Sequence, residues 1–120
     1  MKRKKSIKAL KNECLKIWGK IVLKRDQKCV TCGAPAKHPH HLFPRSRYRH
    51  LWFSLQNGVG LCVSCHYRMH YDPVVPVLYL QAKYPDRMNS LMDDALNGRR
   101  RNPYKRSELE NINVALRASE

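Results

Sequence analysis

Two Cys-x-x-Cys pairs, Cys29/Cys32 and Cys62/Cys65, are the residues of this chain whose spacing most directly indicates chemistry. A two-residue spacer lets both sulfurs of a pair reach one ion from a tight turn, and four thiolates suit a tetrahedral structural zinc. A plain zinc ribbon separates its pairs by roughly 15 to 20 residues, and here the separation is about half as long again. The pairs predict one structural zinc ion with room for further residues between them.

Histidines accompany the cysteine pairs in two groups that can bind a second metal ion. His66 and His70 are four residues apart, which places both imidazoles on one face of a helix, where they can share a metal. His40 and His41 are adjacent on an expected strand, so their side chains point to opposite faces. One of these two rings can therefore bind a metal while the other faces a substrate.

This arrangement resembles the HNH endonucleases, the ββα-metal nucleases, over about residues 27–71. It is most similar to the branch, common in phages and mobile elements, in which four cysteines hold a structural zinc; the general layout also resembles NinG-type recombination proteins. The residues that carry the resemblance are Cys29-x-x-Cys32, His40-His41-Leu42, Asn57, Leu61-Cys62-x-x-Cys65-His66 and His70. The run from His38 to His41 allows more than one register, and Leu42 after His41 favours this one.

The resemblance implies a role for each matching residue. His41 corresponds to the general base, and Asn57 to the residue that orients this base and ties its loop. His40 and His66 correspond to ligands of a catalytic divalent cation, and His70 to an additional ligand found in some branches. The implied activity is metal-dependent hydrolysis of phosphodiester bonds in DNA.

The residue types are suited to that reaction. An imidazole such as His41, with an unperturbed pKa of about 6.5, can take a proton from water near neutral pH. An amide oxygen on Asn57 is expected to hold the other imidazole nitrogen, and a divalent cation can bind the phosphate and stabilise the leaving 3′ oxygen. Imidazole ligands favour Zn²⁺, Ni²⁺, Co²⁺ or Mn²⁺, and Mg²⁺ can serve when phosphate and water supply oxygens.

The charge of the chain indicates a polyanionic partner. Lysine and arginine total 24 against 9 acidic residues, giving a net charge of +15 over 120 residues. This excess favours DNA, although general cationic solubility is an alternative. The expected phosphate contacts lie in the loop 44–57 and in a basic linker: Arg45, Arg47, Arg49, Arg99, Arg100 and Arg101.

A noncatalytic alternative is a four-cysteine zinc module that binds DNA and whose histidines are structural. It explains the charge and the zinc, but it leaves the grouping of His40, His41, Asn57, His66 and His70 unexplained. Isolated histidines are usually not ligands, so neither His38 nor His50 is expected to bind metal. Divalent-dependent nicking of plasmid DNA separates the two functions.

The start of the chain and the length of its apolar stretches indicate the expected compartment and whether the chain crosses a membrane. The basic start of the chain resembles the first part of a signal peptide, but Lys8, Lys11 and Lys16 interrupt any apolar region after it. We therefore expect an intracellular, cytoplasmic protein with no membrane segment, since no apolar stretch reaches about 18 residues.

In a reducing compartment cysteines favour metal over disulfides. The fifth, Cys14, is expected to be a buried apolar residue.

The helices and strands expected from the sequence, which must position these residues, indicate an α+β fold with a small ββα-metal core. Helices are expected over 6–25 (capped by Ser6), 63–71, 76–84, 86–96 (ended by Gly98) and from Ser107 (with a capping box to Glu110), and strands over 37–43 and 58–62. The segments are a basic N-terminal helix (1–26), the zinc-bound nuclease core (27–71), a helical extension (72–97), and a basic linker with a C-terminal helix (98–120).

Two interpretations of the C-terminal segment stay open. It can add only positive charge for DNA, or its helix can pack on the core or on a second subunit. The sequence indicates neither a recognition sequence, nor a nick rather than a double-strand cut, nor an oligomeric state, nor a preferred catalytic metal.

Overall fold

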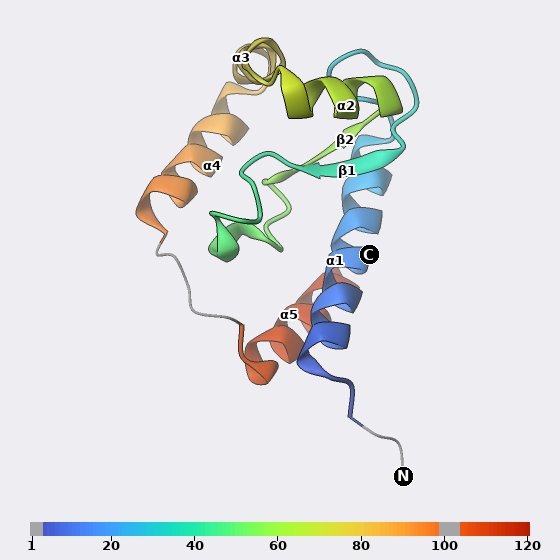
Figure 1. Cartoon of the computed structure of the whole chain (residues 1–120), viewed down its shortest axis with the longest axis vertical. Helices are drawn as coiled ribbons and strands as arrows, with labels where there is room; N and C mark the ends of the chain where they lie inside the picture. The colour runs from blue at the N-terminus through green and yellow to red at the C-terminus, as the bar shows by residue number, and fades with distance from the viewer. Residues whose placement is uncertain (1–3, 99–103) are drawn as a thin grey trace.

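The computed structural model describes residues 4–98 and 104–120, so the expected DNA contacts Arg99, Arg100 and Arg101 lie outside the described residues. The chain has an α+β fold, as the sequence predicts (Figure 1). Its elements are α1 (Ile7–Asp26), β1 (His38–His41), a 3-10 turn η1 (Arg49–Leu51), β2 (Gly58–Leu61), α2 (Val63–Tyr71), α3 (Val74–Lys83), α4 (Pro85–Asn97) and α5 (Arg106–Ala118).

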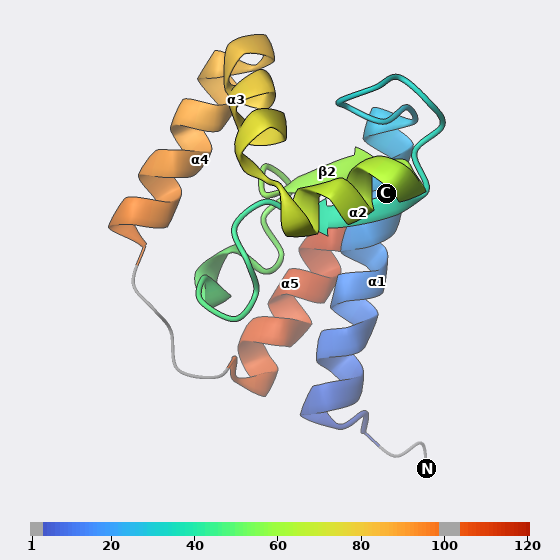
Figure 2. The same cartoon turned by 45° about the horizontal axis from the view of Figure 1, so that its top comes forward.

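A ββα unit forms the centre of the molecule. β1 and β2 pair antiparallel, with His38 opposite Leu61 and His41 opposite Gly58, and α2 follows β2 after one residue. Both α1 and α2 contact the two strands (Figures 1 and 2). Side chains alternate along β1: the ring of His41 stacks on Trp18 of α1, whereas the ring of His40 meets the histidines of α2. The sheet therefore separates the two adjacent histidines as the alternation predicts.

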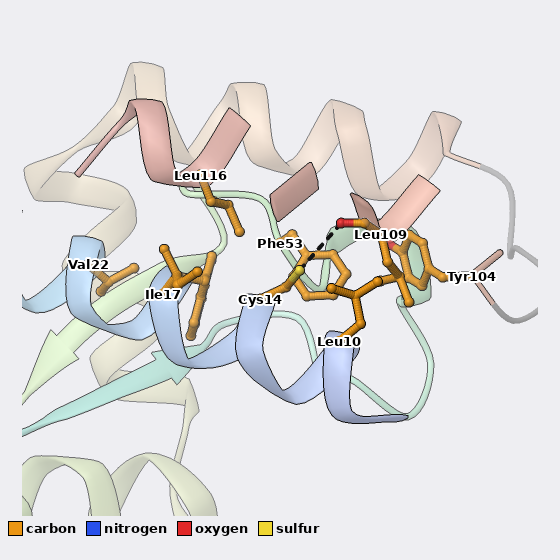
Figure 3. Packing of buried hydrophobic residues seen from close by; sticks show 9 residues of the cluster. Leu10, Cys14, Ile17, Val22, Phe53, Tyr104, Leu109 and Leu116 are labelled. Atoms are coloured by element: carbon orange, nitrogen blue, oxygen red, sulfur yellow. Dashed lines mark hydrogen bonds between the residues drawn. The ribbon is translucent and has the colours of Figure 1, made fainter. Parts of the chain in front are cut away.

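The C-terminal helix α5 packs along α1 and completes the larger hydrophobic core (Figure 3). Leu109 is fully buried, and Leu116 is 5% exposed. Cys14 is also fully buried, and its Sγ contacts the Leu109 carbonyl oxygen at 3.6 Å. Burial raises the pKa of the Cys14 thiol, which fits the expected apolar role. Of the two interpretations of the C-terminal segment, the structure supports packing on the core, so deleting it would remove core residues as well as charge.

The first turn of α3 differs from the sequence prediction. The helix was expected to open at Pro76, but it begins at Val74 with Pro73 in the capping position. Pro76 then occupies the third helical position, where a backbone N–H has no partner within the helix. A proline in the first turn is compatible with either start.

Two helix ends also differ in their local chemistry. Gly98 follows α4 as predicted, yet its φ of −74° is an ordinary extended value and not the left-handed conformation of a glycine cap. A side chain at this position would overlap the ring of His50, so close packing explains the glycine. The capping box predicted from Ser107 to Glu110 is wrong: α5 begins earlier, and the carboxylate of Glu108 accepts the backbone N–H of Lys105 at 3.1 Å.

The described residues contain no helix that is both long and apolar enough to cross a membrane.

Candidate metal centres and the cleft beside the histidines

The four predicted cysteine ligands come together from two turns. The Sγ atoms of Cys29, Cys32, Cys62 and Cys65 all lie within 4.8 Å of one another, and the Cys32 and Cys62 sulfurs are 3.6 Å apart. For Zn–S bonds of about 2.3 Å, tetrahedral sulfurs lie about 3.8 Å apart, so this set fits a zinc ion. Gly33, with φ of 83°, makes the first turn sharp enough for its pair.

The pKa values of the clustered cysteines indicate how a bound cation would stabilise their thiolates. A hydrogen bond with Thr31 lowers the pKa of Cys65, but burial and the three neighbouring thiols raise it to about 12. Burial also acts to raise the pKa of Cys29, and hydrogen bonds, the largest from Thr31, lower it to about 6. Four thiolates cannot share this volume without positive charge, which a bound divalent metal supplies.

Three histidines, one from β1 and two from α2, form a second cluster. The ring nitrogens of His40, His66 and His70 offer donor atoms within 4.8 Å of one another. The Nε2 atoms of His66 and His70 are 3.1 Å apart. For metal–nitrogen bonds of about 2.1 Å, neighbouring donors lie about 3.0 to 3.4 Å apart, so these residues fit a divalent cation.

The charge state of this triad also suits a metal. Burial, together with smaller contributions from the neighbouring His66 and His70, lowers the pKa of His40 to about 4. Burial likewise lowers the pKa of His66, with His70 and His38 adding to the effect. His40 and His66 are therefore neutral near pH 7, which is the form that donates a lone pair to a metal.

His38 contributes to this cluster in a way that the sequence prediction missed. It lies outside the group of three convergent histidines, but its Nδ1 lies 2.8 Å from Nδ1 of His66. If Nε2 of His66 binds a cation, its Nδ1 carries the proton and donates to His38. Such a hydrogen bond fixes the tautomer and the ring orientation of a metal ligand. The available signal was the two-residue spacing from His40, which places both rings on one face of β1.

His41 has the geometry of a base with a fixed tautomer. Its Nε2 lies 2.9 Å from the backbone carbonyl oxygen of Trp52, and a carbonyl can only accept. Nε2 therefore carries the proton and leaves Nδ1 as a proton acceptor. The imidazole stacks on Trp18 with ring centroids 3.9 Å apart and an angle of 10° between the planes. Burial lowers the pKa of His41, the hydrogen bond to the Trp52 carbonyl partly opposes this, and the positive charge of Arg45 adds a smaller lowering effect, so the neutral form prevails near pH 7.

The expectation that Asn57 holds the imidazole of His41 is wrong. Asn57 is fully buried, and its side-chain oxygen accepts the Phe43 N–H at 2.8 Å. Its amide nitrogen donates to the carbonyl oxygens of Phe43 and Leu51 at 3.1 and 3.2 Å. Asn57 therefore ties both ends of the loop 43–57, and the Trp52 carbonyl within that loop orients the base.

A cleft of about 460 Å³ opens onto both His41 and the histidine triad. Arg45, one of the arginines expected to contact phosphate, lines this cleft. Arg47 is exposed, and Arg49 lines a separate pocket beside Trp52. The three loop arginines therefore do not converge on the cleft, and only Arg45 can contact a phosphate bound there.

Comparison with known proteins gives no assignment, because no family model, curated protein or solved structure matches this chain.

The histidine cluster predicts a graded loss of metal affinity. His66→Ala should weaken Mn²⁺ binding most because it removes a central ligand, and His70→Ala should weaken it less. His38→Ala should cost about 10-fold or more, the usual effect of losing the partner of a metal ligand. Calorimetric titration of Mn²⁺ into each zinc-loaded variant measures the series. His50→Ala, on a histidine outside the cluster, is the control; wild-type affinity in His38→Ala would contradict the orienting role.

Proposed function

We propose that this chain is a metal-dependent DNA endonuclease that hydrolyses phosphodiester bonds by the HNH mechanism. The observation that supports this most is that His41, whose tautomer is fixed by the Trp52 carbonyl, lines the same cleft as the three convergent histidines. A zinc module that only binds DNA has no need for either feature.

Each residue of the cleft has a distinct task in this proposal. Nδ1 of His41 takes the proton from the attacking water, while the Trp52 carbonyl keeps the ring in the required tautomer. His40, His66 and His70 hold the divalent cation, and His38 orients His66. When bound, that cation supplies charge neutralisation at the scissile phosphate and at the leaving 3′ oxygen. The cation can be Mg²⁺, Mn²⁺, Ni²⁺, Co²⁺ or Zn²⁺.

The remaining features serve binding and folding. Arg45 at the cleft and the net charge of +15 favour an anionic polymer, and phosphate contacts of this kind position DNA without reading its sequence. Cys29, Cys32, Cys62 and Cys65 hold a structural zinc that is separate from the reaction. DNA is therefore the proposed partner, and hydrolysis the proposed chemistry.

Incubation of supercoiled plasmid with the zinc-loaded protein tests the function. Relaxed or linear product should form when Mg²⁺, Mn²⁺, Ni²⁺, Co²⁺ or further Zn²⁺ is added to protein that carries one zinc per chain, and should be absent without it. His66→Ala should need a higher concentration of the same ion. A wild-type protein that binds plasmid but leaves it intact with every ion would instead support the noncatalytic zinc module.

A further inference from the structure

A second pocket, of about 330 Å³, lies beside Trp52 between α1 and α5. Its apolar walls include Ile7, Trp52 and Tyr104, and its rim carries Lys8, Lys11 and Arg49. Among its lining residues in the described part of the chain, none is acidic. An aromatic surface surrounded by three cations is suited to a planar ring that carries a phosphate.

The side chain of Trp52 connects this Trp52 pocket to the cleft. Arg45, which lines the cleft, has its guanidinium carbon 5.3 Å from the centre of the Trp52 ring, and Lys11 has its Nζ 5.4 Å from the same centre. The indole Nε1 also donates to the Arg45 carbonyl oxygen at 2.7 Å. A polyanion bound at Arg45 would therefore continue onto the rim of the Trp52 pocket.

We infer that the Trp52 pocket binds one unpaired nucleotide of the DNA substrate, with its base against Trp52 and its phosphate at Lys8, Lys11 and Arg49. This inference rests on the proposed function and adds a preference for DNA with a single-stranded or branched segment next to the cut. A base inside a duplex has both faces stacked and cannot enter, whereas an unpaired base can stack on an aromatic side chain.

Two double variants on α1 distinguish nucleotide binding in this pocket from the general attraction of DNA by positive charge. The rim pair, Lys8→Gln/Lys11→Gln, removes two positive charges from the rim of the pocket. The control pair, Lys16→Gln/Lys20→Gln, removes the same charge from exposed positions outside the pocket. Binding of a 12-nucleotide oligothymidylate and of a 12-base-pair duplex is measured in the His41→Asn background, so that the DNA stays intact. Tryptophan fluorescence is recorded in the same titrations, since Trp18 is 2% exposed and Trp52 is more accessible.

The rim pair should lose about 10-fold or more in affinity for the oligothymidylate and about 3-fold or less for the duplex. The control pair should lose the same factor for both. Oligothymidylate, but not duplex, should quench tryptophan fluorescence. Equal losses in the two pairs, or quenching by neither DNA, would overturn the inference even if the protein cuts plasmid. A protein that shows the selective loss and quenching but never cuts would keep the inference and contradict the nuclease.

Discussion

Cys62→Ser is expected to leave the chain without zinc and largely unfolded. A structural zinc contributes on the order of 10 kcal/mol of folding free energy, which is comparable to the whole stability of a small domain. The cysteines also belong to the hydrophobic cluster between the turns, α2 and α3, so losing the ion exposes apolar surface. Metal analysis and circular dichroism on the purified variant, with one zinc per chain in the wild type, measure both effects.

Substitution by serine tests the loss of the metal without the loss of the helix cap. Cys62 caps the N-terminus of α2 by accepting the Cys65 N–H on its sulfur, and serine is a good residue for that position. Local helix propensity is therefore preserved, and the effect reports the metal. Cys14→Ser is the matched control: Cys14 is buried but outside the thiol cluster, and this variant should keep one zinc and its fold. A folded Cys62→Ser protein with wild-type melting would contradict the structural zinc.

Those parts of the fold that depend on local pattern could be predicted from sequence. α2 has the predicted bounds, and both strands lie within their predicted ranges. The alternation of His40 and His41 followed from the geometry of a strand alone. The cysteine and histidine clusters were predictable because fixed spacings on a turn, a strand and a helix leave few ways to arrange them.

The contacts that depend on the path of a loop could not be predicted. Backbone carbonyls have no signature in a sequence, so the contact between Trp52 and His41 is visible only once the loop 43–57 is folded. The Gly58 carbonyl is a second example, because it accepts hydrogen bonds from Arg25 of α1 and Arg87 of α4. The sequence predicts no role for either arginine, yet together they fix the start of β2 next to Asn57. The same reasoning explains why Asn57 was assigned to the wrong partner.

His41→Ala and His41→Asn are expected to reduce plasmid cleavage by about 10²- to 10⁴-fold, the usual effect of removing a general base. Asparagine can still donate a hydrogen bond to the Trp52 carbonyl, but it cannot accept a proton from water. Both variants should therefore lose cleavage activity to the same extent, because each lacks a base, whether or not it keeps the hydrogen bond to Trp52. Single-turnover cleavage at saturating DNA and Mn²⁺ measures the loss in the chemical step.

The interpretation depends on what the two variants retain. Zinc content, melting temperature, DNA affinity and Mn²⁺ affinity should stay near wild type, because His41 is not one of the three clustered histidines that offer donor atoms to the cation. Added imidazole should partly restore cleavage in His41→Ala, since the small ring can enter the space that the side chain leaves and accept the proton. Restoration by a higher Mn²⁺ concentration would instead make His41 a metal ligand. Unchanged cleavage by rigorously purified His41→Ala would mean that another group activates the water, and the tautomer fixed by Trp52 would then have no part in the reaction.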